Sequence, residues 1–150
     1  MDLVKRIRPD LPILITATHI DDEFFMEALA LGARGCIGEE SLRDNFLKAI
    51  RTVKDGLVWA PRRVIGKFIE RHAVLPTGGG GKVTDREGEI LGLLLSGRSN
   101  REIARPLGIK TRTVKSHLSA MMRKLGVRNR IELSSYAIRH SELIPEPYQG

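Results

Sequence analysis

Two motifs of the same form in the second half of this chain are typical of helix starts. Residues 84–87 (Thr-Asp-Arg-Glu) and residues 99–102 (Ser-Asn-Arg-Glu) both follow the pattern S/T-x-x-E. In this pattern the hydroxyl and the carboxylate accept hydrogen bonds from backbone amides that lack partners in the first turn of a helix. Apolar residues at helical spacing follow each motif, and then a glycine that can end the helix, Gly97 in the first case and Gly108 in the second. We therefore expect two consecutive short helices separated by a tight turn.

A third helix is predicted from about Thr111 to Leu125. Its apolar side chains recur at the spacing i, i+4, i+7, i+8, i+11, which places them on one face: Val114, Leu118, Met121, Met122 and Leu125. The far side carries residues that donate hydrogen bonds: Arg112, Lys115, Ser116, Ser119 and Arg123. Two helices joined by a short turn, the second with a polar outer face, are the helix-turn-helix motif of DNA-binding proteins. The residues therefore predict DNA binding.

The positive charge of the chain is concentrated in its second half. Residues 1–75 carry 12 Lys and Arg against 11 Asp and Glu, whereas residues 76–150 carry 13 against 7. Between Arg98 and Arg130, ten basic residues accompany one acidic residue, Glu102. A basic domain beside a nearly neutral one favours a polyanionic partner for the basic half alone. A solvated surface would also explain the charge by itself, but it would not explain the charge together with the helix pattern.

The first half of the chain alternates strand and helix patterns. Residues 12–18 and 35–38 predict short strands, and helices are expected over residues 21–31 and from a Ser41 cap to Gly56. The side chains expected to face inward are Phe24, Phe25, Ala28 and Leu29 or Leu31 in the first helix, and Leu42, Phe46, Ala49, Ile50 and Val53 in the second. This order is a βαβ unit with a parallel strand pair. Because two parallel strands do not form a stable sheet alone, this half is expected to be part of a larger domain.

Two segments connect the halves. Residues 61–73 are expected to form an amphipathic connecting helix whose apolar face consists of Val64, Ile65, Phe68 and Ile69. Residues 77–82, Thr-Gly-Gly-Gly-Gly-Lys, predict a flexible linker, because consecutive glycines lose much backbone entropy inside a helix or strand. A phosphate-binding loop is the alternative, but the G-K-[ST] sequence that it needs is absent.

Residues 3–8 have the pattern of the end of a further helix.

Composition excludes several classes of protein. No apolar run approaches the ~20 residues of a membrane-spanning helix, and the first residues lack the apolar core of a signal peptide. The single cysteine, Cys36, is expected to be a small buried residue on a strand, far along the sequence from all four histidines, so no disulfide, metal centre or cofactor is expected. His19 lies near Asp21 and Asp22 in what we interpret as a polar loop, and no catalytic arrangement is recognisable. We therefore expect a cytoplasmic protein that is not an enzyme.

The chain resembles response regulators of the NarL/FixJ class, with a LuxR-type DNA-binding domain. The resemblance is strongest in five blocks that match in order and spacing: residues 84–91, 99–104, 113–117 and 124–127, and Arg130. Residues 1–60 are similar to the second half of a phosphoacceptor receiver domain, in which Thr16 and Ala17 stand where receivers carry the switch threonine or serine.

The expected fold class is an α/β partial receiver (βαβα) followed by an all-α helix-turn-helix domain of four helices. We expect the partial receiver over residues 1–60 and the connecting helix with its glycine-rich linker over residues 61–82. The DNA-binding domain is expected over residues 83–150.

The resemblance implies a division of labour within the third helix. Lys115, Ser116 and Ser119 fall where family members reach base edges in the major groove. Thr113 and His117 fall nearer the phosphates, and the predicted DNA-binding set is completed by three basic residues, Arg112, Arg123 and Lys124. A lysine can donate to guanine O6 and N7, whereas serine hydroxyls discriminate bases less sharply. His117 has an alternative interpretation, a helix histidine that only faces solvent.

A fourth helix, from about Ile131 to His140, resembles the helix that commonly makes the dimer contact in this family. Three of its residues fit a dimer contact and a cover for the core equally well: Leu133, Tyr136 and Ala137. The sequence does not separate these two interpretations.

Four features depart from the family pattern. The phosphoacceptor aspartate and the acidic pair that holds magnesium fall upstream of this chain, and residues 21–23 cannot replace them because they open a helix. Glu39 stands where receivers carry a lysine, and Cys36 where they carry the switch aromatic. Pro106, late in the second helix, removes an amide and shortens or bends that helix. We therefore expect no phosphoacceptor in this chain and no switching by ordinary aspartate phosphorylation.

Two functions are consistent with these features. The first is a sequence-specific DNA-binding transcription regulator that acts as a homodimer. Its partners would be double-stranded DNA and a second copy of the chain, with RNA polymerase as a further candidate and no membrane. The second is an interaction module that pairs with a full-length response regulator and modulates it. Binding of DNA by the chain alone separates the two.

Overall fold

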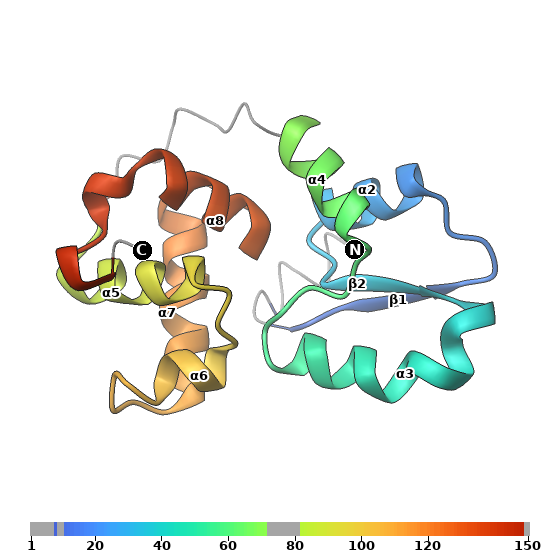
Figure 1. The fold of residues 1–150 in the computed structure, drawn as a ribbon, viewed down its shortest axis with the longest axis horizontal. Coiled ribbons are helices and arrows are strands. Elements are labelled where there is room, and N and C mark those ends of the chain that lie inside the picture. Colours follow the sequence, from blue (N-terminus) through green and yellow to red (C-terminus); the bar gives the residue numbers. More distant parts are fainter. Residues whose placement is uncertain (1–7, 9–10, 72–81, 149–150) are drawn as a thin grey trace. The chain divides into compact units, whose positions relative to one another are not determined.

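A computed structural model describes residues 8, 11–71 and 82–148 of the chain (Figure 1). The chain divides into two compact units, an N-terminal unit (Met1–Arg71) and a C-terminal unit (His72–Gly150). Most of the predicted helix end at residues 3–8 and the glycines of the predicted linker lie outside the described residues.

The N-terminal unit is built on two parallel strands, β1 (Leu14–Ala17) and β2 (Gly35–Gly38). Helix α2 (Asp22–Ala30) connects the strands, and α3 (Glu39–Lys54) and α4 (Arg62–Arg71) follow β2. Figure 1 shows α3 on one side of the strands and α2 on the other. Their buried side chains include Phe25, Met26, Ala28, Leu29, Ala49, Val53, Val64 and Phe68. The predicted βαβα order is confirmed.

Cys36 lies in the middle of this arrangement. It is buried in β2 with a free thiol, and burial raises the pKa of that thiol to about 12. A thiol that is neutral and shielded in this way is a packing residue rather than a nucleophile. The expectation of a small buried residue on a strand is confirmed.

The prediction that Ser41 caps the second helix of this unit is wrong. Helix α3 begins at Glu39, and Gly38 occupies the N-cap without a side-chain hydrogen bond. The helix starts earlier because the chain turns into it directly from the last residue of β2. Glu39 and Glu40 in the first turn then place negative charge at the positive end of the helix dipole.

Several side chains that were predicted to face inward are exposed instead. Phe24 on α2 and Phe46 and Ile50 on α3 belong to this group, whereas Leu29, one of the two alternatives at the end of α2, is buried as predicted. Leu42 is half-buried, and Met26 is buried although it was not predicted to be. Two strands present too narrow a surface to cover the full apolar face of each helix, so only the residues nearest the sheet are buried.

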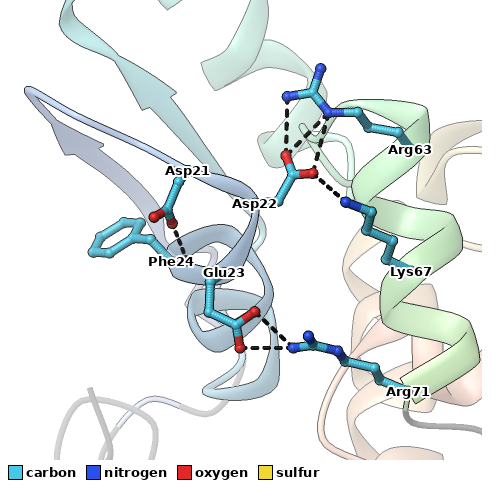
Figure 2. Close-up of polar contacts among 7 residues, drawn as sticks. All are labelled: Asp21, Asp22, Glu23, Phe24, Arg63, Lys67 and Arg71. Atoms are coloured by element: carbon cyan, nitrogen blue, oxygen red, sulfur yellow. Dashed lines mark hydrogen bonds and ion pairs between the residues drawn. The ribbon is translucent and has the colours of Figure 1, made fainter.

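Helix α4 packs on α2 through both apolar and charged contacts. Val64 and Phe68 have no exposed surface. Arg63 Nη2 lies 3.0 Å and Lys67 Nζ 2.8 Å from the two oxygens of Asp22, and Arg71 Nη1 lies 2.7 Å from Glu23 Oε1 (Figure 2). The basic residues recur every four positions and so form one row along α4. The expected connecting helix is therefore held on the N-terminal unit.

The C-terminal unit consists of four α-helices in the described part of the chain. They are α5 (Asp85–Leu95), α6 (Asn100–Ala104), α7 (Thr111–Lys124) and α8 (Arg130–Arg139). Its core includes Ile90, Leu91, Ile103, Val114, Leu118, Met121, Leu125 and Leu133. The predicted all-α domain of four helices is confirmed.

Two short 3₁₀ turns, η1 (Ser141–Leu143) and η2 (Glu146–Tyr148), follow α8. The segment returns to α5, where a Cβ atom on Gly92 would lie 2.3 Å from the Cβ atom of Tyr148. Only glycine allows this approach. Ile144 is buried in the core cluster, so the end of the described chain is part of the unit.

The charged contact between α2 and α4 makes a pH-dependent contribution to stability. Hydrogen bonds from Lys67 and Arg63 lower the pKa of Asp22. A carboxylate with a lowered pKa in the folded state stabilises the fold fully above its unfolded pKa of about 3.9, and this contribution disappears as the pH falls through the lowered value. Asp22→Asn should therefore lower the Tm of the N-terminal unit near neutral pH, and the difference from the wild type should shrink in acid.

Thermal unfolding followed by circular dichroism between neutral pH and about pH 2 measures this difference. Asp44→Asn is the matched control, because Asp44 is exposed on α3 and forms no ion pair within the described residues. A Tm difference for Asp22→Asn that stays constant down to the lowest pH would contradict the prediction.

Candidate nucleic-acid interface

Both predicted capping boxes are present in the structure. Thr84 N donates to Glu87 Oε2 at 2.8 Å, and Glu87 N donates back to Thr84 Oγ1 at 3.3 Å. Ser99 and Glu102 make the same reciprocal pair at 2.8 and 3.3 Å. Each box satisfies backbone amides at a helix start, so the first residues of α5 and α6 are fixed as the sequence predicts.

The second predicted helix is shorter than expected. It ends at Ala104, and Leu107 follows it in the turn as a half-buried residue that packs against the core. Pro106 has no amide to donate and its ring disfavours continuation of the helix. The chain reverses through Gly108, which has a φ of +63°, and Ile109 N donates to Ala104 O at 3.1 Å. Pro106 therefore shortens the helix and leaves the helix-turn-helix intact.

Helix α7 is fixed in rotation by its apolar side. Val114 and Met121 have no exposed surface, and Leu118 and Leu125 are buried beside them. Met122 is half-buried at the edge of this stripe. The predicted helix and its core face are confirmed.

The predicted site residues lie on two adjoining surfaces of α7. With about 100° between successive residues, five of them fall within one arc that we call the outer face: Arg112, Lys115, Ser116, Ser119 and Arg123. Thr113, His117 and Lys124 fall on a second arc, the flank, between the outer face and the core. Lys115, His117, Ser119 and Lys124 are half-buried, and the other four residues are exposed.

Lys124 makes a contact that sequence reasoning missed. Its Nζ atom donates to Glu87 Oε2 at 2.6 Å, and the two side chains are 26% and 10% exposed. Burial raises the pKa of Glu87, but the hydrogen bonds from Lys124 and Thr84 outweigh it, so the pKa is lowered overall. This ion pair fastens the end of α7 to the start of α5. No local pattern signals a pair that is 37 residues apart.

Arg130 is a second structural residue in the basic half. It is buried, and its guanidinium donates to Asn100 Oδ1 at 3.2 Å and to the carbonyl oxygen of Arg98. The start of α8 is thereby joined to the first residue of α6 and to the turn before it. Arg130 is one of the five matched sequence blocks, and the structure shows it as a buried contact and not as an exposed charge.

The sequence left a dimer contact and a cover for the core open for three residues of α8, and two of them belong to the core. Leu133 and Ala137 have no exposed surface, whereas Tyr136 is half-buried and lies with its ring centroid 4.3 Å from that of His140. Ile138, on the other side of the helix, is 66% exposed. The exposed side of α8 is therefore the side available to a partner.

The N-terminal unit contains an open cavity of about 930 Å³ whose lining includes His19, Asp21 and Asp22. Asp21 caps α2 by accepting from Phe24 N at 2.8 Å, and Asp22 is bound to α4. Within the described residues, no group of His, Cys, Asp and Glu side chains is arranged to hold a metal ion. None of the described helices has both the length and the apolar character needed to cross a membrane.

The fold and the site define a helix-turn-helix domain preceded by part of a receiver-like unit. Residues 82–137 match the family model "Bacterial regulatory proteins, luxR family". The chain is 31% identical to the transcriptional regulatory protein MctR of Rhizobium johnstonii, over 93% of this chain and 65% of that protein. It is 33% identical to the transcriptional regulatory protein DesR of Bacillus subtilis, over 80% of this chain and 56% of that protein.

Among solved structures, the response regulator RcsB of Salmonella typhimurium matches 92% of this chain and 66% of its own, with 25% identity and a TM-score of 0.39. Residues 82–137 are a helix-turn-helix domain of the luxR family, and the chain is similar over most of its length to regulators of the LuxR/NarL class, with part of a receiver before that domain. It spans less than two thirds of the length of MctR and DesR. The family is one of regulatory proteins and not of enzymes, as the sequence predicts.

The ion pair between Lys124 and Glu87 should be measurable as a coupling energy. Glu87→Gln and Lys124→Met should each destabilise the C-terminal unit, and a double-mutant cycle should give a coupling of about 1 kcal/mol, since the pair is partly buried. The coupling should be complete above the usual glutamate pKa of about 4.3 and should be lost as the pH falls through the lowered pKa of Glu87.

Urea unfolding of the four proteins at two pH values measures the cycle. Arg123→Met, a change of the exposed neighbour, is the control and should show no coupling to Glu87→Gln. Additive effects of the two substitutions at neutral pH would show that the contact does not stabilise the fold.

Proposed function

We propose that this chain is a sequence-specific, dimeric DNA-binding transcription regulator of the cytoplasm, and that α7 reads the major groove. One observation carries the proposal: a helix whose core side is fully packed presents Arg112, Lys115, Ser116, Ser119 and Arg123 on one outer face. A helix at this position of a helix-turn-helix enters the major groove. The excess of basic residues in the same unit favours a polyanion.

The residues of α7 divide by chemistry. Lys115, Ser116 and Ser119 are the proposed base-reading residues, because they lie together on the outer face and can donate to base edges. Arg112 and Arg123 are exposed and are proposed to contact phosphates, which set affinity without setting sequence. Thr113 and His117 on the flank are proposed to contact phosphates as well. Lys124 also belongs to the predicted DNA-binding set, and its ammonium group forms an ion pair with Glu87.

Dimerisation is proposed to involve the exposed side of α8. Leu133 and Ala137 are in the core, so a partner would meet Ile138 and its neighbours instead. A twofold dimer would place two copies of α7 in successive major grooves of an inverted repeat. RNA polymerase is a further proposed partner, through parts of the C-terminal unit that DNA leaves uncovered.

Control by a route other than ordinary aspartate phosphorylation is also proposed. Glu39, in the first turn of α3, stands where receivers carry a lysine, and a carboxylate there would repel a phosphoryl group. Cys36, where receivers carry the switch aromatic, is buried in β2. Glu39 and Cys36 thus stand in place of two residues that receivers use in the usual response to phosphorylation.

An interaction module that pairs with a full-length regulator is the second candidate, and the surface of the N-terminal unit favours it. Within the described residues β1 pairs only with β2, so its other edge has no strand partner. Among the described residues of this unit, the exposed large apolar side chains are Leu11, Phe24, Leu31, Phe46, Leu47, Ile50 and Ile69. An open strand edge beside apolar surface is suited to association with another chain.

Selection from random duplex DNA with the purified chain tests the first function against the second. We expect an inverted repeat whose half-sites lie about one helical turn apart, because a twofold dimer fixes that spacing. A single half-site would contradict the dimer. Failure to bind any duplex, with binding restored by a full-length relative, would favour the interaction module.

Substitutions in α7 test the reading face. Lys115→Ala should cost about 1–3 kcal/mol on the selected site and little on random DNA, because it removes a base contact. Arg123→Ala should weaken binding to both DNAs alike and reduce the salt slope by about 1. Fluorescence anisotropy titrations at several salt concentrations measure both effects. Identical behaviour of the two variants on the two DNAs would show that the assignment of this face is wrong.

A further inference from the structure

We infer that residues 141–148, which we call the strap, control DNA binding without contacting DNA: the closed strap holds α5 in place, and α5 in turn holds α7. The strap lies beyond residues 82–137, the part of the chain that matches the luxR family. None of its residues belongs to the predicted DNA-binding set. The inference rests on the proposed function and deepens it, because it adds a conformational element that acts on the same reading helix.

The strap packs against one side of α5 (Figure 1). Gly88 and Gly92 lie four positions apart and therefore share that side of the helix. A Cβ atom on Gly88 would overlap the carbonyl oxygen of Leu143 and lie 3.0 Å from Pro145 Cδ. A Cβ atom on Gly92 would overlap the Cβ atom of Tyr148. Glycine is disfavoured inside a helix relative to alanine, and the close approach of the strap accounts for both glycines.

The strap also completes the burial of α5. Residues 90–94 are all buried, and they span more than one full turn, so the helix is covered on every side. Ile144 is 3% exposed and belongs to the core cluster, and Tyr148 packs against that cluster. A helix that is buried all round depends on each of its neighbours. The core covers one side of α5, and the strap covers the side of the glycines.

The backbone bonds within the strap are local. Leu143 N donates to His140 O and Ile144 N to Ser141 O, each at 3.0 Å, and Tyr148 N donates to Pro145 O at 2.9 Å. Each of these bonds spans three residues and belongs to a short 3₁₀ turn, whose geometry is poorer than that of an α-helix. A terminal segment of this kind opens at a lower free energy than the helices of a core. The strap can therefore be released while the helices remain folded.

Helix α5 contacts the helix-turn-helix on the way to the strap. Glu87, the neighbour of Gly88, forms the 2.6 Å ion pair with Lys124 at the end of α7. Arg86 Nη2 donates to Leu107 O, in the turn before α7, at 2.6 Å. A displaced α5 would loosen both of these contacts. Closure of the strap and binding of DNA by α7 are thus coupled, and the coupling is reciprocal, so bound DNA favours the closed strap.

Gly92→Ala in the full chain tests this coupling, because Gly92 is buried beneath the strap and its substitution removes no DNA contact. The added methyl group would collide with the strap and open it. Affinity for the selected DNA site should fall about tenfold, which lies within the usual range of coupling between sites. Tyr148→Ala, which loosens the strap without adding atoms to α5, should lower affinity in the same direction. Anisotropy titrations well below the Tm, with circular dichroism of each variant, measure the effect.

Hydrogen exchange of the peptide that contains the strap gives a readout that general destabilisation would not produce. In free Gly92→Ala the strap should exchange faster than in the wild type, while α7 keeps its protection. In the wild type, the selected DNA site should slow the exchange of the strap. Slower exchange with DNA, together with unchanged affinity of both variants, would show that DNA covers the strap directly and would overturn the inference.

Gly66→Ala is the matched control. It is the same substitution inside α4, where an added Cβ atom meets no neighbouring atom within 4 Å. It should leave DNA affinity and the exchange of the strap unchanged. Wild-type affinity of Gly92→Ala and Tyr148→Ala, with an exchange rate of the strap that DNA does not alter, would overturn this inference and leave the proposed function intact. Absence of any DNA binding by the wild type would overturn both.

Discussion

The buried stripe of α7 is the constraint on which the rest of the C-terminal unit depends. Val114 and Met121 are fully enclosed, and Leu118 and Leu125 are nearly so. Turning the helix would expose these side chains to water and bury Lys115 and Ser119 without partners, and both changes cost free energy. The core therefore decides which polar residues of α7 face outward. The outer face is a consequence of packing as much as of its own sequence.

The few acidic residues of the C-terminal unit are largely engaged inside it, which leaves its outer basic charge unbalanced. Glu87 binds Thr84 and Lys124, Glu102 binds Ser99, and Glu132 binds Arg128 with one oxygen 2.8 Å from Nη2. Each of these carboxylates satisfies a helix start or a nearby cation. The positive charge of Arg112 and Arg123 on the outer face of α7 is not offset by these three carboxylates, because each of them is held by other groups.

In the N-terminal unit the sheet is small relative to the helices that pack on it. Two parallel strands cover part of the apolar surface of α2 and α3, and exposed side chains such as Leu47 remain around them. Helix α4, the last element before the described part of the C-terminal unit, is docked by Val64 and Phe68 and by the row of ion pairs with α2. The connection between the units thus begins on a well-anchored helix.

Local sequence determined the helices, both capping boxes, the glycine ends, the short parallel strands and the polar face of α7, because each depends on neighbours a few residues apart. Tertiary structure alone decided the partner of Lys124, the burial of Arg130, the start of α3 at Glu39 and the exposure of Phe24 and Phe46. These features depend on residues tens of positions away or on how much sheet is present to cover a helix. A periodic pattern tells which side of a helix is apolar, but the surface that packs against it decides how much of that side is buried.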